Sequence, residues 1–322
     1  MTNIRILCNC PINHLPEAKQ ILESVGEVTY AEYKYPQLLQ VIGGFDTLLP
    51  SLDVRLDEKM LMCAKRLKLI ATPSTGTDHI DLKSAEKMGI KVISLKGEYE
   101  LLKKITATAE LTIGLLLALV RRIPFAFDCV KQGKWSSQDF RGNELFGKTL
   151  GIIGYGRLGE MVARYANSFG MQVIAYDPYK TIQETSVKQV DFEALLHSAD
   201  IITLHVHLND ETKGLISEKA FSLMKDGVYI INTSRGAVID EGLLLEALQS
   251  GKVKGAALDV LAGECEGKLQ NHPLIGYARN HSNLIITPHI GGVTYESQKK
   301  AYTLIAQKIK EFYATEKYRK CS

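Results

Sequence analysis

The sequence predicts an α/β protein with two parallel-sheet domains, Rossmann-like or flavodoxin-like, one of them inserted into the other. Three observations support this prediction. Strand-like and helix-like patterns alternate through the first hundred of the 322 residues and again from Lys148 onward. A glycine-rich turn lies between two apolar runs near the middle of the chain. An amphipathic segment, 294–317, follows the second series and could return to complete the first domain.

Composition and charge restrict the class of protein. The chain is 45% hydrophobic and 23% charged, as expected of a globular protein, and its formal net charge is only +3. Because no cluster of Lys and Arg stands out, we expect neither a nucleic-acid partner nor a membrane surface. The longest apolar stretch, 111–120, is too short to cross a bilayer, and we expect no signal peptide.

The six cysteines are scattered, and none forms a CxxC pair. Cys8 and Cys10 alternate on the first expected strand, where we interpret them as reduced, half-buried thiols rather than as a metal or redox pair. We therefore expect no metal site, no disulfide and a cytoplasmic location.

Short apolar runs in the first hundred residues are expected to form a small parallel sheet. The expected strands are 4–8, 27–31, 45–49, 67–71 and 90–95. Helical patterns lie between them at 16–24, 57–65 and 81–88.

A long helix is expected at residues 106–122. Glu110 lies in its first turns and Arg121 and Arg122 near its end, as the helix dipole favours. Its broad apolar surface suggests a helix that joins two domains. Residues 124–147, which contain the only tryptophan, are expected to be irregular or partly helical.

A second series of alternating elements begins at Lys148. Strands are expected at 148–153, 172–176, 200–205, 227–232, 255–259 and 283–287, with helices at 157–168, 191–197, 217–224 and 240–250. Asp240 is the expected N-cap of the last of these helices. The predicted division is a first domain at 1–100, a second at 101–291 and a return to the first at 292–322.

The middle of the chain carries the motif Gly154-x-Gly156-x-x-Gly159 directly after an apolar run. A helix-compatible segment follows, and the next apolar run ends in Asp177, close to the roughly 20-residue spacing expected of a ribose-binding acid. Such a turn lets the backbone approach a pyrophosphate at a helix N-terminus. The sequence therefore predicts a nicotinamide dinucleotide. Asp177 favours NAD because a carboxylate would repel a ribose 2′-phosphate, although Lys180 leaves mixed use open.

Three later strands lead to polar side chains that suit hydride transfer to a 2-keto acid. The fourth strand of the second series leads to Arg235, the fifth to Asp259 and Glu264, and the sixth to His289. Because ligands bind at the carboxyl ends of strands in open α/β sheets, these residues are expected at one rim. An arginine can hold the carboxylate and polarise the carbonyl. A histidine beside a carboxylate can donate a proton near neutral pH.

Taken singly, each of these residues also has an ordinary structural interpretation. Arg235 could form a surface ion pair, His289 could be a loop residue, and Glu264 could be a solvated charge, with Glu266 competing for its role. Their occurrence after successive strands of a dinucleotide-binding fold favours the functional interpretation.

The segments around these residues resemble the signatures of the D-isomer-specific 2-hydroxyacid dehydrogenases, of the phosphoglycerate dehydrogenase type without a regulatory domain. The resemblance covers nearly the whole chain from Gly76 onward. It rests on Asn232-Thr233-Ser234-Arg235-Gly236, Ala257-Leu258-Asp259-Val260, Thr287-Pro288-His289-Ile290-Gly291-Gly292, Gly147-Lys148-Thr149-Leu150 and Leu204-His205-Val206.

This resemblance implies an NAD-dependent enzyme that interconverts a D-2-hydroxy acid and its 2-keto acid. It assigns substrate binding to Arg235, proton donation to His289, assistance of that histidine to Glu264, and orientation of the nicotinamide to Asp259. It places the cofactor against Tyr155, Gly156, Arg157, Leu158, Asp177, His205, Val206, Thr233, Ser234, Arg235, Asp259, His289 and Gly291. It places the substrate against Ser74, Thr75, Gly76, Lys96, Gly97, Arg235 and His289. It also implies a homodimer formed through the inserted cofactor domain.

Three departures from the family pattern concern the site. Cys265 follows Glu264 where the family commonly has Pro, which leaves the loop geometry open, and His207 also stands where Pro is usual. For both His205 and His207 we favour a structural role. The segment 96–110 is longer than the usual loop, and its lysines, Lys103 and Lys104, could meet a phosphate on the substrate, although solvated lysines are the simpler interpretation.

Two other functions remain open on the sequence. The chain could be an NAD(H)-dependent binding or corepressor-type protein without significant turnover, which the presence of Arg235, Glu264 and His289 argues against. It could also oxidise formate or phosphite, but a formate-type site carries Gln where this chain has Glu264.

Overall fold

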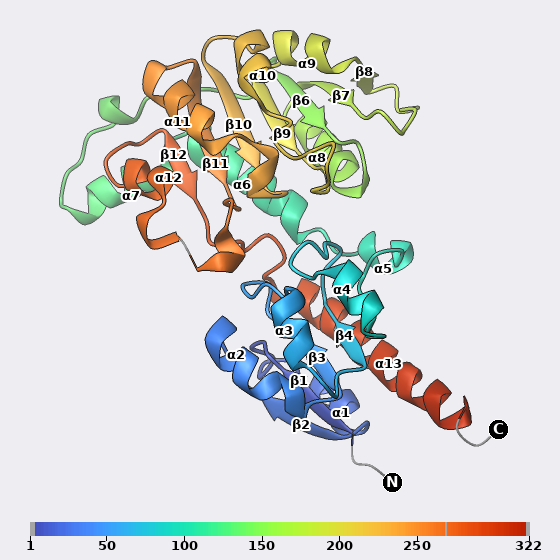
Figure 1. The fold of residues 1–322 in the computed structure, drawn as a ribbon. Coiled ribbons are helices and arrows are strands. Elements are labelled where there is room, and N and C mark those ends of the chain that lie inside the picture. Colours follow the sequence, from blue (N-terminus) through green and yellow to red (C-terminus); the bar gives the residue numbers. More distant parts are fainter. Residues whose placement is uncertain (1–3, 268, 320–322) are drawn as a thin grey trace. The chain divides into compact units, whose positions relative to one another are not determined.

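The computed structural model describes residues 4–267 and 269–319, which form two compact units. Unit 1 contains the residues up to Ile105, the short segment Cys265–Gly267 and the residues from Val293 onward. Unit 2 contains most of the chain between Thr106 and Gly292. Each unit is built on one parallel sheet, so the prediction of two parallel-sheet α/β domains is confirmed (Figure 1).

The sheet of unit 1 has the order β2-β1-β3-β4-β5, and all its neighbouring strands are parallel. Its strands are β1 (Arg5–Cys8), β2 (Glu27–Tyr30), β3 (Thr47–Leu49), β4 (Leu69–Ala71) and β5 (Lys91–Ile93). All five were predicted, each one to three residues longer than observed. The strand order is that of flavodoxin-like sheets, in which the strand order reverses between β1 and β3.

Helices cover both faces of this sheet because successive strand residues point to opposite sides. Ile6 and Leu69 face a cluster that includes α1 (Pro16–Glu23) and α13 (Tyr295–Arg319). Leu7 and Ile70 face the other cluster. That second side is covered by α2 (Tyr35–Val41), α3 (Glu58–Cys63) and α4 (Leu82–Lys87). The C-terminal helix α13 therefore contributes to the core of unit 1, whereas α2 and the short α5 (Tyr99–Leu102) were not predicted.

Cys8 and Cys10 are both buried as free thiols, with their Sγ atoms 3.6 Å apart. The prediction that they would be half-buried was therefore wrong, because both thiols are almost fully buried. The hydrogen bond between the two thiols, together with burial, raises the pKa of Cys8. A raised pKa disfavours the thiolate and suits a structural thiol.

The sheet of unit 2 has the order β12-β11-β10-β9-β6-β7-β8, again all parallel. Its strands are β6 (Thr149–Ile153), β7 (Gln172–Tyr176), β8 (Val187–Gln189), β9 (Ile201–Leu204), β10 (Val228–Asn232), β11 (Val253–Leu258) and β12 (Leu284–Ile286). Six were predicted, and the edge strand β8 was not. The order of strands reverses between β6 and β9, and at such a switch point the carboxyl ends of the strands open a crevice for a ligand.

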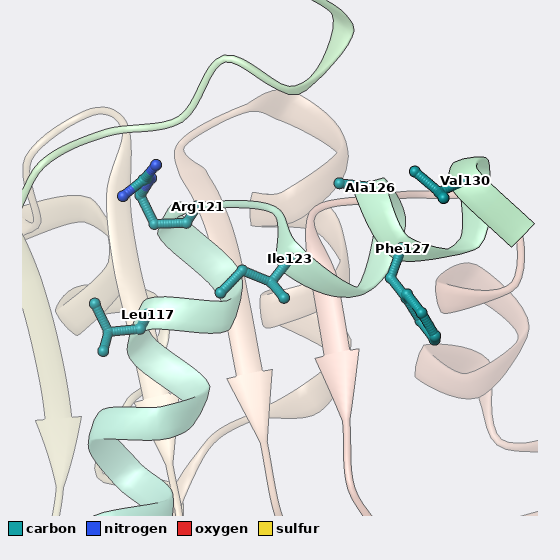
Figure 2. Close-up of a pocket in the computed structure, with 6 residues that line it drawn as sticks. All are labelled: Leu117, Arg121, Ile123, Ala126, Phe127 and Val130. Atoms are coloured by element: carbon teal, nitrogen blue, oxygen red, sulfur yellow. The ribbon is translucent and has the colours of Figure 1, made fainter. Parts of the chain in front are cut away.

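One face of this sheet is covered by α6 (Ala107–Val120) and α8 (Arg157–Ser168). The helix that follows, α7 (Ile123–Lys131), has no buried residue. Its apolar side chains and the end of α6 line a shallow groove of about 500 Å³ (Figure 2). The lining residues are Leu117, Arg121, Ile123, Ala126, Phe127 and Val130.

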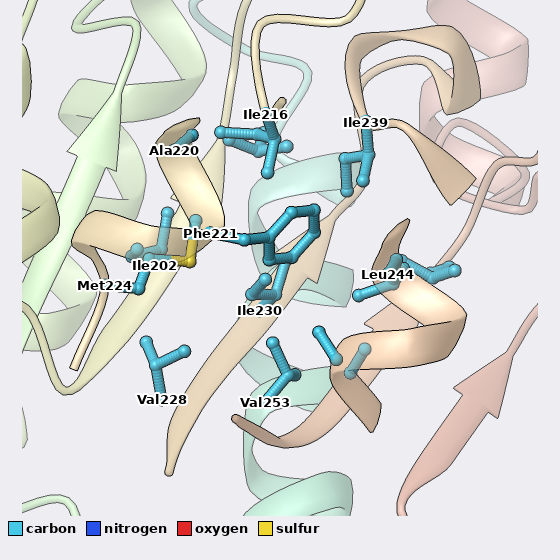
Figure 3. Close-up of a cluster of buried hydrophobic side chains, with 14 of the residues drawn as sticks. Ile202, Ile216, Ala220, Phe221, Met224, Val228, Ile230, Ile239, Leu244 and Val253 are labelled. Carbon is cyan, nitrogen blue, oxygen red and sulfur yellow. The ribbon is translucent and has the colours of Figure 1, made fainter. Parts of the chain in front are cut away.

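The opposite face is covered by α9 (Phe192–Ser198), α10 (Glu218–Leu223), α11 (Glu241–Ser250) and α12 (Pro273–Ala278). Figure 3 shows Phe221 of α10 among Ile230, Ile239 and Leu244. The Asp240 side chain accepts a hydrogen bond from the Leu243 amide at 3.1 Å, which confirms the predicted N-cap of α11. The short α12 was not predicted. In the part of the chain that is described, no helix has both the length and the apolarity needed to span a bilayer.

The substitution Ile305→Ala should destabilise unit 1, because Ile305 of α13 is fully buried in the core that β1 and α1 share. We expect the free energy of unfolding to fall by ~2–5 kcal/mol, measured by denaturant titration. Gln307→Ala, at an exposed position of the same helix, is the control and should change it by less than about 0.5 kcal/mol. An equal, small effect of both substitutions would contradict the place of α13 in this core.

Candidate active site

The glycine turn after β6 packs against the end of the neighbouring strand β9. Gly154 adopts a φ of 91°, in the left-handed region that favours glycine. A Cβ atom at Gly154 would lie 2.6 Å from the carbonyl oxygen of His205, and one at Gly159 would lie 2.3 Å from the carbonyl oxygen of Gly154. A Cβ at Gly156 would meet no described atom within 4 Å. Two glycines of the motif are therefore needed for packing, and the middle one borders open space.

Asp177 is anchored beside this turn by two backbone amides. Its Oδ2 accepts a hydrogen bond from the Tyr155 amide, and its Oδ1 accepts one from the Tyr179 amide, both at 2.9 Å. Each carboxylate oxygen can accept a further hydrogen bond. Lys180, the residue that left NADP use open, forms an ion pair with Glu160.

The residues around the turn fit a dinucleotide. The space over Gly156 opens at the N-terminus of α8, where backbone amides attract a pyrophosphate, and Arg157 and Leu158 begin that helix. His205 Nε2 is paired with the Thr203 hydroxyl at 2.9 Å, and burial lowers the pKa of His205 to about 4. This arrangement supports a structural role for a neutral His205. Its buried Nδ1 has no hydrogen-bond partner among the described residues.

The turn that carries Arg235 is fixed by the buried side chain of Asn232 at the end of β10. Its Oδ1 accepts hydrogen bonds from the amide and hydroxyl of Ser234 at 3.0 and 2.8 Å, and its Nδ2 donates to the carbonyl of Arg235 at 2.9 Å. The guanidinium of Arg235 is half-buried, and its Nη1 donates to the Ser234 carbonyl at 2.7 Å. The Thr233 hydroxyl lies 2.9 Å from that of Thr112 on α6.

Asp259, at the end of β11, organises the loop after β12. Its Oδ1 accepts hydrogen bonds from the Thr287 hydroxyl at 2.6 Å and the Ile290 amide at 2.9 Å, and its Oδ2 accepts one from the Gly291 amide at 2.8 Å. Burial raises the pKa of Asp259 and outweighs the opposing effect of these hydrogen bonds. The residue between these contacts, His289, has a φ of 54°, a left-handed conformation that costs ~1–3 kcal/mol for a non-glycine residue.

His289 and Glu264 form a direct pair. Because a carboxylate only accepts, His289 Nδ1 donates to Glu264 Oε1, at 2.8 Å, and Glu264 Oε2 accepts from the Leu261 amide at 3.2 Å. Burial of the ring lowers the pKa of His289, but the hydrogen bond and charge of Glu264 raise it by more. The smaller effects of Arg235 and Asp259 oppose each other, so the net pKa lies above the ordinary value. Glu266, the competing carboxylate, is exposed.

Five of the residues predicted to bind the substrate lie in unit 1. Ser74, Thr75 and Gly76 follow β4, and Lys96 and Gly97 follow the neighbouring strand β5. The Ser74 hydroxyl donates to the Gly76 carbonyl at 2.7 Å, and the Ser74 carbonyl accepts from Leu95 at 2.9 Å. The structure thus gathers these five residues at the carboxyl edge of the unit 1 sheet. It gathers the cofactor residues, Arg235, Glu264 and His289 within unit 2.

Two threonines of α6 contact the loop after β12 and the turn after β10, and the sequence did not predict them. Thr108 donates to the carbonyl of Gly291 at 3.0 Å, and Thr112 lies against Thr233. Residues four apart share one side of a helix, so two threonines at this spacing within a mostly apolar helix were the available signal.

Comparison with known proteins gives the family. Residues 113–291 match the model of the D-isomer specific 2-hydroxyacid dehydrogenase NAD binding domain. A hydroxypyruvate reductase from Thermotoga maritima is 37% identical over 311 residues, which are 96% of this chain and 98% of that protein. The chain belongs to the D-isomer specific 2-hydroxyacid dehydrogenase family. The prediction of that family from the sequence, and of NAD as the cofactor, is confirmed.

The relatives that the chain matches differ in length. A D-3-phosphoglycerate dehydrogenase from Methanocaldococcus jannaschii is 39% identical over 313 residues, 96% of this chain but 57% of that protein. The chain thus spans little more than half of this relative. A solved D-lactate dehydrogenase from Aquifex aeolicus, complexed with NAD and lactic acid, has a TM-score of 0.83 and 32% identity, covering 97% of this chain and 96% of the other. The family is one of NAD-dependent oxidoreductases.

Substitutions at the glycine turn should separate folding from cofactor binding. Gly156→Ala should leave the melting temperature unchanged, because its Cβ meets no protein atom, but weaken NADH binding by filling space over the turn. Gly154→Ala should lower the melting temperature, because the residue has a positive φ and its Cβ would collide with the His205 carbonyl. Thermal unfolding and NADH fluorescence titration measure the two effects. Wild-type NADH affinity in Gly156→Ala would show that the dinucleotide does not lie over this turn.

Proposed function

We propose that this family member catalyses the NAD-dependent interconversion of a D-2-hydroxy acid and its 2-keto acid. The observation that carries the proposal is the pair formed by His289 and Glu264, which lies in the NAD-binding unit and within electrostatic reach of Arg235. A partly exposed histidine with a raised pKa is a suitable proton donor near neutral pH.

Each side chain has a role that follows from its contacts. Because His289 Nδ1 is directed at Glu264, Nε2 is the atom that gives a proton to the carbonyl oxygen during reduction and takes it back during oxidation. The planar donor fork of Arg235 suits a carboxylate and the adjacent carbonyl oxygen. Asp259 orients the nicotinamide carboxamide and holds the loop of His289 in place. Bound NADH supplies the hydride.

The remaining predicted residues complete the two binding surfaces. We propose that the dinucleotide lies along the glycine turn, with Asp177 on the adenosine ribose, and that residues 101–291 form the cofactor domain. We propose that the substrate is also held by Ser74, Thr75, Gly76, Lys96 and Gly97 of a split substrate domain, 1–100 and 292–322. The relatives named above suggest a small 2-keto acid, of the kind that a hydroxypyruvate reductase or a D-lactate dehydrogenase takes. Five free thiols among the described residues are consistent with a cytoplasmic location.

The rival functions have less in their favour. No observation supports a binding or corepressor-type protein without turnover. Oxidation of formate is disfavoured because Glu264, rather than a glutamine, pairs with His289.

We also propose a homodimer formed through unit 2. The groove lined by α6 and α7 exposes apolar side chains that a monomer would leave in water, among them Phe127 with 62% of its surface accessible. Trp135, which follows α7, is 91% exposed. Exposed apolar side chains that line one groove are typical of a protein interface.

His289 should be essential for reduction of a 2-keto acid. A panel of glyoxylate, pyruvate, hydroxypyruvate and its 3-phosphate with NADH should reveal a substrate, and His289→Gln should lower kcat by about 10²- to 10⁴-fold with NADH affinity retained. His197→Gln, at an exposed position of α9, is the matched control. No turnover with any acid by a chain that binds NADH would refute the proposed activity.

The pH profile of the same reaction tests the role of Glu264. Because Glu264 raises the pKa of His289 above the ordinary 6.5, the acid form persists to higher pH, and reduction should decline only as pH rises through this raised value. Glu264→Gln should move that decline to lower pH. An unmoved profile would mean that another group donates the proton.

The groove variant Phe127→Asp should convert the dimer into monomers, because a carboxylate in an apolar interface is costly to bury. Light scattering should give twice the chain mass of 35.7 kDa for the wild type and that mass for the variant. Phe146→Asp, at an exposed aromatic residue outside the groove, should remain dimeric. A wild-type chain that is monomeric at high concentration would exclude this interface.

A further inference from the structure

A second carboxylate–histidine pair, Glu241 and His272, is linked to the pair of Glu264 and His289 through the Leu261–Ala262 segment. Glu241, the first residue of α11, pairs through Oε2 with His272 Nε2 at 3.0 Å, and its Oε1 accepts a hydrogen bond from the Ala262 amide at 2.8 Å. The Glu241 and His272 side chains are only 14% and 12% exposed. A nearly buried carboxylate that accepts two specific hydrogen bonds is part of the folded structure rather than a solvated surface charge.

The segment that Glu241 holds also supports both proposed catalytic side chains. The Leu261 amide donates to Glu264, and the next amide, that of Ala262, donates to Glu241. A Cβ added to Gly236 would lie 2.1 Å from the Ala262 nitrogen and from the Leu261 carbonyl carbon. The residue after Arg235 therefore rests directly on the Leu261–Ala262 peptide, so a displacement of this peptide moves the supports of Glu264 and of Arg235 together.

The usual role of a glutamate in the first turn of a helix does not account for these contacts. Such a residue favours the helix by facing its free amides. Here Asp240 is the N-cap, and the Glu241 carboxylate is bonded to Ala262, outside the helix. Because a carboxylate only accepts, His272 Nε2 donates to Glu241, and the buried Nδ1 has no hydrogen-bond partner among the described residues.

We propose that Glu241 is a positioning residue for the pair of Glu264 and His289, with His272 orienting its carboxylate. This inference rests on the proposed function. Glu241 touches neither the substrate nor the cofactor in this scheme, and it acts by fixing the peptide that Glu264 and the turn of Arg235 share.

The test compares Glu241→Ala with Glu241→Gln, and with Glu246→Ala at an exposed position of the same helix. Glu241→Ala should lower kcat for keto-acid reduction about ten- to a hundredfold, with the NADH dissociation constant unchanged. The alkaline decline of the reaction should move to lower pH, because Glu264 no longer holds its place beside His289. The other charged groups that face His289, Arg235 and Asp259, are unaltered in every variant. Glu241→Gln keeps an acceptor for the Ala262 amide and should retain most of kcat and the wild-type profile, as should Glu246→Ala.

Two results would overturn the inference. One is a wild-type pH profile in Glu241→Ala with activity reduced only in proportion to the folded fraction, and the other is an equal loss in Glu241→Gln. If the wild-type chain reduces no keto acid, the proposed function fails. A measurement that does not depend on turnover then tests the positioning role of Glu241. The ring signal of His289 in an NMR titration, assigned with His289→Gln, should then have a lower midpoint in Glu241→Ala than in the wild type. An unchanged midpoint would exclude a positioning role.

Discussion

The buried carboxylate of Asp259 is the interaction on which the candidate site depends. It accepts hydrogen bonds from Thr287, Ile290 and Gly291, and the Asp259 carbonyl accepts one from the His289 amide. These bonds hold His289 in a left-handed conformation that its side chain disfavours. A buried carboxylate in turn needs such donors, because without them its burial would be costly. The conformation of His289, and hence its contact with Glu264, therefore depends on Asp259.

Most of the fold could be predicted because its signals are local. Apolar runs, the glycine motif and the Asp240 cap each lie within a few residues of the element they define, and they gave eleven of the strands within three residues of their ends. The elements that were missed, such as β8 and α12, are three and six residues long. Segments this short are stabilised mainly by packing against the rest of the fold. The local sequence pattern does not show these tertiary contacts.

For the site, the sequence indicated the residues at strand ends but not the side chains that hold them. Arg235, Glu264 and His289 stood out because polar residues follow buried strands. The partners Thr112 and Thr233 are 121 positions apart, and Glu241 and Ala262 are 21 apart. A hydrogen bond between distant positions leaves no periodic pattern, so the roles of Thr112 and Glu241 became visible only in three dimensions.

The division of unit 1 into two chain segments has a consequence for how the protein is made. The core cluster that contains Ile6 and Leu22 is completed by Ile305 and Ile309, and all of unit 2 lies between them in the sequence. During synthesis, therefore, unit 2 has emerged from the ribosome before α13 can cover the apolar side of α1. Although domains generally form in N-terminal-first order, here the middle of the chain can fold before its beginning. The nascent first hundred residues then keep an uncovered apolar surface until α13 has been synthesised, and exposed apolar surface of this kind is what chaperones bind.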